Sequence, residues 1–90
     1  MDCRNKLELG QVVKALAGRD KDNVFVVVGI IDNDHVSIAD GAKRKIEAPK
    51  RKKIKHLQKY NLISESINEK LVKGEKLDDS DIRKELSLYK

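Results

Sequence analysis

The sequence is poor in cysteine and in long apolar runs, and each shortage excludes a class of protein. Cys3 is the only cysteine among the 90 residues, so no internal disulfide can form and a reducing compartment is expected. No run of about 18 apolar residues occurs, which argues against a membrane-spanning helix. Asp2, Arg4, Lys6 and Glu8 at the N-terminus are unlike a signal peptide. We therefore expect a soluble, cytoplasmic protein with no membrane partner.

Groups that perform catalysis or bind metals are also scarce. His35 and His56 are the only histidines, neither has a pair of carboxylates at a telling spacing, and no glycine-rich phosphate loop is present. Cys3 does not combine with these histidines into a recognisable metal-binding pattern. We predict a protein that is not an enzyme and that needs neither a metal nor a cofactor.

What the sequence has in excess is positive charge, and the excess lies in one stretch. Residues 43–60 hold nine Lys and Arg against one acidic residue, Glu47, whereas residues 1–42 hold five basic and seven acidic residues and residues 61–90 hold six and seven. An ordinary solvated surface mixes both signs. A cluster of like charges repels itself, and a polyanion relieves that repulsion while releasing its own counterions. Nucleic acid is therefore the predicted partner.

The first half of the chain predicts short strands separated by turns. Residues 9–17 suit a first strand, and residues 35–39 alternate between apolar and polar side chains as a returning strand should. The run 24–31 is apolar on both alternating faces, which predicts a strand buried on both sides or wrapped inside a small barrel. Gly29 within this run indicates a bend or a bulge.

The centre of the chain predicts a further hairpin. Asp40-Gly41 is the strongest turn signal, and it should lead into a fourth strand over residues 44–47. Pro49 lacks an amide donor and must interrupt the sheet or lie at its edge, so the basic stretch should divide between that strand and a following loop. Ile54 and Leu57 suit a short closing strand or turn that holds this loop against the core.

After Tyr60 the apolar period changes from two to about four, which predicts a helical hairpin. Asn61 or Ser64 can cap the first helix and Gly74 can end it, while Asp78–Asp81 begin the second. The predicted apolar faces are Ile63, Ile67 and Leu71 in the first helix and Ile82, Leu86 and Tyr89 in the second. Isolated helices this short are unstable in water, so both should pack against the barrel, each other or another molecule.

The order of these features resembles that of KOW domains. The residues that support the resemblance are Leu9-Gly10-Gln11-Val12-Val13, Ala17-Gly18-Arg19-Asp20-Lys21, the apolar strand, Asp40-Gly41, Pro49–Lys53 and His56-Leu57. The chain is most similar to the KOW-bearing large-subunit ribosomal proteins of archaea and eukaryotes, the six-e, fourteen-e and twenty-seven-e group, and to their short bacterial relatives. The resemblance covers residues 7–58 and leaves residues 61–90 as a helical appendage. It implies a mainly β fold with an α tail, in which a small, strongly bent SH3-like barrel of about five strands grips ribosomal RNA with its loops.

One position departs from the usual KOW sequence. A glycine normally follows the lysine of the first loop, and here Asp22 and Asn23 follow Lys21. Asp and Asn tolerate positive φ angles better than other residues with a side chain, so we expect the turn to be kept.

The basic stretch predicts RNA recognition through shape and phosphates rather than through unstacked bases. The chain has only three aromatic residues; Phe25 is predicted to lie in the core, and Tyr60 is the one stacking candidate near the basic stretch, with covering the core edge an equally good role. Arg44 could bind two phosphate oxygens at once. The predicted RNA-binding residues are Arg19, Lys21, Lys43, Arg44, Lys45, Lys50, Arg51, Lys52, Lys53, Lys55 and His56.

The sequence thus predicts a non-catalytic RNA-binding protein that associates with the ribosome and docks on phosphates of structured RNA through a basic loop. Its predicted partners are ribosomal RNA and ribosomal or translation proteins. Three alternatives remain open. An adaptor of the translation or transcription machinery would expose the apolar faces of the tail helices as a docking groove. The segment Pro49–Lys53 also matches a nuclear localisation signal, although its place inside a predicted folded domain favours phosphate contact. DNA could replace RNA as the ligand.

Overall fold

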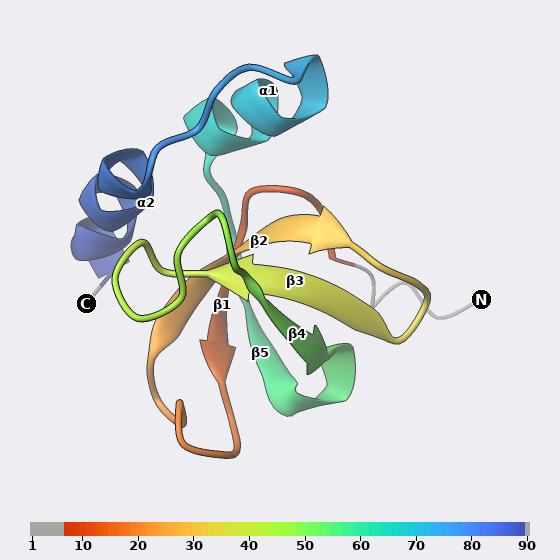
Figure 1. The fold of residues 1–90 in the computed structure, drawn as a ribbon. Coiled ribbons are helices and arrows are strands. Elements are labelled where there is room, and N and C mark those ends of the chain that lie inside the picture. Colours follow the sequence, from red (N-terminus) through yellow and green to blue (C-terminus); the bar gives the residue numbers. More distant parts are fainter. Residues whose placement is uncertain (1–6, 90) are drawn as a thin grey trace.

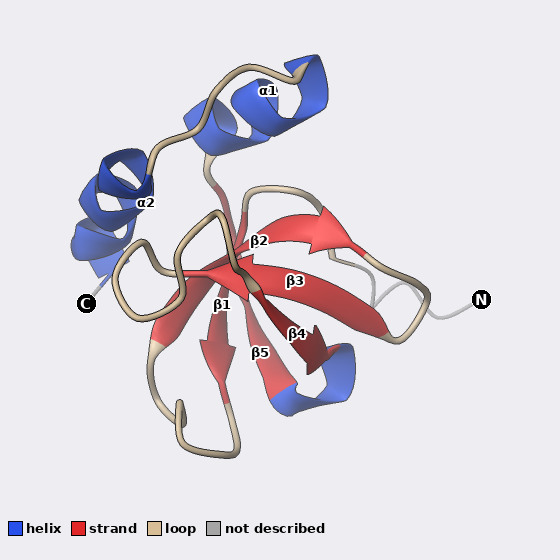
Figure 2. Cartoon of the chain, viewed as in Figure 1, coloured by secondary structure: helices blue, strands red, loops and turns tan. Residues whose placement is uncertain are grey.

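The computed structural model describes residues 7–89, with the backbone alone for Tyr89, so Cys3 lies outside the described residues. One antiparallel sheet has the strand order β4-β3-β2-β1-β5 and bends into an SH3-like barrel, with two short helices beside it (Figure 1). The predicted mainly β fold with a helical tail is confirmed. The strands are β1 (Gln11–Ala15), β2 (Val24–Ile30), β3 (His35–Ala39), β4 (Lys50–Lys53) and β5 (Leu57–Ile63). The helices are α1 (Glu65–Lys73) and α2 (Asp79–Leu86), with short 3-10 turns η1 (Ile54–His56) and η2 (Ser87–Tyr89) (Figure 2).

The first half of β2, Val24–Val27, is buried on both faces as predicted for the apolar run 24–31, whereas Ile30 and Ile31 at the end of the run are about half exposed. Successive side chains of a strand point to opposite faces, so Phe25 lies inside the barrel and Val26 lies on its outer side. The barrel interior contains Leu7, Val13, Ala15, Phe25, Val27, Val36, Ile38 and Leu57. The outer cluster joins the sheet to the tail and contains Val12, Val24, Val26, Ala39, Ile67, Leu77, Ile82 and Leu86. The helical tail is therefore part of the hydrophobic core.

The ends of both helices follow local sequence signals. The Ser64 hydroxyl caps α1 by accepting from the amide of Ile67, and Gly74 ends this helix with a left-handed φ of 74°. Asp78 and Asp81 form a reciprocal capping box at the start of α2. These predicted ends are confirmed.

The start of the tail was predicted too early. Residues 61–63 belong to β5, so Asn61 caps no helix and Ile63 lies on a strand. The buried side-chain amide of Gln11 donates to the carbonyls of Tyr60 (2.6 Å) and Leu62 (2.9 Å), where the register between β1 and β5 shifts. This contact extends the sheet to Ile63, and helical periodicity alone does not reveal it.

The predicted order of strand and loop in the basic stretch is wrong: residues 44–47, predicted as the fourth strand, are a loop, and Lys50–Lys53, predicted as a loop after Pro49, form strand β4. Asp40 Oδ1 accepts from the amides of Ala42 and Arg44 at 2.9 Å each, and Asp79 Oδ1 accepts from the amide of Ile46 at 2.7 Å. These amides therefore bond to carboxylates instead of to β3. Sheet pairing begins directly after Pro49, in the register Ile38 to Lys50.

Two predicted backbone irregularities are confirmed. The register of β2 against β3 shifts between Val27 and Gly29, which is a bulge at the expected glycine. Asp22 has a φ of 72°, the left-handed turn predicted where KOW sequences have glycine. Among residues 7–89, no helix is long and apolar enough to span a bilayer.

Candidate nucleic-acid interface

The predicted RNA-binding residues occupy four neighbouring segments of the barrel. Arg19 and Lys21 lie in the β1–β2 loop, residues 43–45 in the β3–β4 loop, residues 50–53 form β4, and residues 55 and 56 lie in η1. The β1–β2 loop contacts the other segments directly: the Lys52 ammonium donates to the carbonyl of Ala17 (3.2 Å), and the amide of Leu16 donates to the carbonyl of His56 (2.9 Å). The fold thus gathers at one edge predicted RNA-binding residues that are up to 37 positions apart in the sequence, from Arg19 to His56.

Asp20 fastens these segments together. Its side chain is 7% exposed, and its Oδ2 atom accepts from Lys50 Nζ at 3.0 Å and from the Arg44 guanidinium at 3.3 Å. The hydrogen bond from Lys50, together with the positive charges of Lys50 and Arg44, holds the pKa of the Asp20 carboxyl below its usual value, although burial acts in the opposite direction. Two of the predicted phosphate ligands are therefore engaged within the protein.

The two faces of β4 present their basic side chains differently. Lys50 and Lys52 pair with Ile38 and Val36, which are buried inside the barrel, and both lysines are half-buried. Arg51 and Lys53 pair with Ser37 and His35, and both are exposed. Since side chains alternate along a strand, only Arg51 and Lys53 of the four point fully to solvent.

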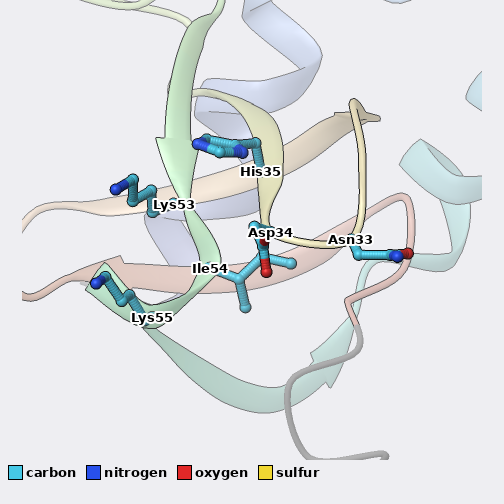
Figure 3. A pocket seen from close by; sticks show the side chains of 6 residues that line it. All are labelled: Asn33, Asp34, His35, Lys53, Ile54 and Lys55. Carbon is cyan, nitrogen blue, oxygen red and sulfur yellow. The ribbon is translucent and has the colours of Figure 1, made fainter.

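A shallow pocket lies where β3, β4 and η1 meet. Its volume is about 330 Å³, and its lining residues are Asn33, Asp34, His35, Lys53, Ile54 and Lys55 (Figure 3). The amide of Ile54 donates to the carbonyl of Asp34 at 2.8 Å, which fixes the start of η1 against the β2–β3 turn. In Figure 3 the side chains of Lys53 and Lys55 extend to the same side, whereas Asn33 points the opposite way. The pocket therefore has a basic rim on one side.

Asp32 orders the β2–β3 turn beside this pocket. Its Oδ1 atom accepts from the amides of Asp34 and His35, each at 2.8 Å, and lies 3.0 Å from His35 Nδ1. The bond from the Asp34 amide, followed by the bond to the His35 ring, lowers the pKa of the Asp32 carboxyl. The imidazole of His35 is thus held in one orientation at the pocket wall.

The β3–β4 loop is held by α2, a contact that no local sequence signal predicts. Besides the bond from the Ile46 amide to Asp79, the Arg83 guanidinium donates to the carbonyl of Gly41. Gly41 has a φ of +79°, and a Cβ atom there would approach the Asp79 carbonyl oxygen to 2.4 Å. The helix therefore positions the loop that presents Lys43 and Lys45, both of which are exposed.

The sequence predicts the basic residues of this surface but not the residues that orient them. Asp20, Asp79 and Arg83 have ordinary polar identities, and only their tertiary contacts distinguish them. His35 has no pair of carboxylates at a catalytic spacing, but the single Asp three residues before it is a signal for a local side-chain contact. Within residues 7–89, no group of three or more His, Cys, Asp and Glu side chains is arranged to hold a metal ion.

Neither Phe25 nor Tyr60 presents a fully exposed ring for base stacking. Phe25 is fully buried in the barrel, as predicted. Tyr60 is half-buried and packs against the outer cluster, which agrees with the alternative role of covering the core edge. The surface that these elements form offers exposed ammonium and guanidinium groups around a small polar pocket. Such a surface can bind phosphates, sugars and hydrogen-bonding groups.

Comparison with known proteins finds one informative relative. No family model matches the chain, so the KOW resemblance stays a prediction. The chain is 38% identical over 65 residues to a Bacillus subtilis (strain 168) protein named "Putative ribosome-binding protein YbzG", and the alignment spans 68% of this chain and 88% of the relative. An identity of this size over most of the relative shows common ancestry, and the chain therefore belongs to the family of Bacillus subtilis YbzG.

Proposed function

We propose that the protein is a non-catalytic RNA-binding protein that associates with the ribosome in the cytoplasm and docks on phosphates of structured ribosomal RNA. The observation that carries the proposal is the exposed triad of Arg51, Lys53 and Lys55 on β4 and η1, which we call the basic triad. Among the described residues, none of the three forms an ion pair. The name of the relative, a ribosome-binding protein, supports the ribosome as the partner.

Recognition of RNA by its backbone follows from the side chains present at this edge. Readers of single strands stack bases on exposed aromatic rings, whereas Phe25 lies in the barrel interior and Tyr60 is half-buried against the outer cluster. Structured RNA instead offers regularly spaced phosphates, which exposed Lys and Arg side chains bind without unstacking bases. Lys43, Lys45, Arg19 and Lys21 extend the positive surface from the adjoining loops.

The adaptor alternative loses most of the predicted apolar faces of the tail, although Ile63 is 39% exposed and Leu71 is half-buried. Ile67, Ile82 and Leu86 are at most 1% exposed because they cover the outer face of the sheet. Buried side chains of this kind belong to the core and cannot form a docking groove. We therefore propose RNA binding, which the exposed basic triad favours over the adaptor role.

Sedimentation of the ribosome with a charge-deleted variant tests this proposal. The variant Arg51→Ala, Lys53→Ala, Lys55→Ala removes the basic triad, and its matched control is Lys73→Ala, Lys76→Ala, Lys84→Ala, which removes three exposed charges from the tail. Lysate is sedimented through sucrose at low and high salt. The wild-type protein and the control should co-sediment with large subunits in low salt and dissociate in high salt, because phosphate contacts weaken as counterions become abundant.

The triad variant should remain near the top of the gradient at salt concentrations at which the control still co-sediments with large subunits. If six to ten phosphates are bound, wild-type affinity should fall about a thousandfold or more between about 50 and 200 mM salt. Each removed contact should lower the slope of log affinity against log salt by about one. Circular dichroism should show an intact fold for both variants. Equal sedimentation of the triad variant and the control would refute the proposal.

A further inference from the structure

His35 is placed to contact the sugar of a nucleic acid bound along the basic triad. It faces Lys53 across the β3–β4 pair, and neighbouring side chains on one face of an antiparallel pair have Cβ atoms about 5 Å apart. The side chains of Lys53 and Lys55 extend to one side of the pocket (Figure 3), and His35 lines the same pocket. A phosphate bound by these two lysines would therefore bring its own ribose next to the imidazole.

The Asp32 carboxylate decides which nitrogen of His35 is available to a ligand. Asp32 Oδ1 lies 3.0 Å from His35 Nδ1, and a carboxylate can only accept, so Nδ1 bears the hydrogen. In the neutral imidazole, Nε2 is then a hydrogen-bond acceptor. The side chain is 19% exposed, so the ring is largely enclosed while still lining the pocket.

An acceptor beside two ammonium groups suits RNA better than DNA. The lysines bind the phosphates of either polymer, but only a ribose offers a 2′-hydroxyl hydrogen to an acceptor. Asp34 also lines the pocket, and its carboxylate disfavours a phosphate inside it. The phosphates should therefore lie at the rim formed by Lys53 and Lys55, with the sugar facing His35.

We propose that His35 Nε2 accepts a hydrogen bond from a ribose 2′-hydroxyl of RNA held by Lys53 and Lys55, which makes His35 a residue that selects RNA over DNA. This inference rests on the proposed RNA-binding function and adds to it a means of discrimination. It would also decide between RNA and DNA as the ligand, which charge alone leaves open.

The test compares two duplexes that differ only at the 2′ position. The probes are a fully paired RNA duplex and the same duplex with 2′-fluoro riboses, which keep the A-form shape but cannot donate. Affinities of the wild type, His35→Phe and Lys53→Ala are measured by fluorescence anisotropy at pH 8. One neutral hydrogen bond gives about a 3- to 10-fold preference.

The wild type should prefer the RNA duplex by that factor. His35→Phe, which keeps a ring in place, should bind both duplexes with the affinity that the wild type shows for the 2′-fluoro duplex. Lys53→Ala should weaken both equally and keep the preference. A wild type without any preference, or a preference that survives in His35→Phe, would overturn the role of His35 while RNA binding stands. Failure of the wild type to bind either duplex would overturn the proposed function as well.

Discussion

The two faces of β4 contain the same kinds of side chain and serve different purposes. Lys50 and Lys52 lie half-buried over the barrel, where Lys50 binds Asp20 and Lys52 binds the carbonyl of Ala17. Arg51 and Lys53 point to solvent, and neither forms an ion pair among the described residues. One face therefore fastens the β1–β2 loop to the sheet, and the other is available to a ligand.

The difference comes from strand alternation rather than from residue type. The pairing of Lys50 with Ile38 and of Lys52 with Val36 places these lysines on the face that covers the barrel core. A lysine can lie along apolar surface with its methylene groups while its ammonium reaches a polar partner. A run of basic residues in a strand should therefore be read as two surfaces, of which one can be structural.

The largest expected effect comes from breaking the inner contact at its acceptor. Replacing Asp20 by Ala leaves the Lys50 ammonium and the Arg44 guanidinium, both partly buried, without their carboxylate. We expect the free energy of unfolding to fall by about 2 kcal/mol, as when one partner of a hydrogen-bonded charge group is removed. Urea unfolding measures it. A loss below about 0.5 kcal/mol would show that the inward-facing side chains of β4 contribute no more to stability than the outward-facing ones.

The next effect compares neighbouring residues of β4 directly. Lys50→Met should lower the free energy of unfolding by about 1 kcal/mol, because Asp20 then keeps only its longer bond to Arg44. Arg51→Met should change stability by less than about 0.5 kcal/mol but weaken RNA binding. Urea unfolding and anisotropy on the same two proteins provide both readings. A smaller loss in free energy of unfolding for Lys50→Met than for Arg51→Met would contradict the roles assigned to the two faces.

The smallest effect concerns pH and again depends on Asp20. Its pKa in the folded protein lies below the ordinary value of 3.8, so its contribution to stability is present above that value and is lost as the pH falls through the lower folded pKa. The wild type should thus exceed Asp20→Asn in free energy of unfolding at neutral pH, and the difference should shrink below pH 3.8. Unfolding curves recorded at several acidic pH values measure it. A constant difference would indicate that the carboxylate charge is not involved.

Much of the fold could be predicted because its signals are local. The apolar run 24–31, the capping residues Ser64 and Asp78, and Gly74 each act on their own few residues, and each is where the pattern predicts. The errors occur where distant groups compete for a backbone amide. Asp79 draws the amide of Ile46 away from strand pairing, and the Gln11 amide bonds to the carbonyls of Tyr60 and Leu62 in β5.

The candidate site was predictable in composition but not in geometry. The charge of residues 43–60 identifies the basic region, but it does not distinguish Lys50 from Arg51 as a phosphate ligand. Their separation depends on the register of β4 against β3, and that register depends on where the β3–β4 loop ends. The pairing of Asp32 with His35 is local, but the approach of Lys53 and Lys55 to the same pocket is not.

The sequence by itself determined the class of the protein: a small, mainly β domain with a helical tail, one concentrated basic region and too few aromatic residues for a stacking surface. These properties follow from composition and from short-range periodicity, which are fixed before any distant contact forms. The tertiary structure alone decided which basic residues face solvent and that the tail completes the core. The reason is that side-chain direction and burial depend on pairing register and on packing between segments far apart in the chain.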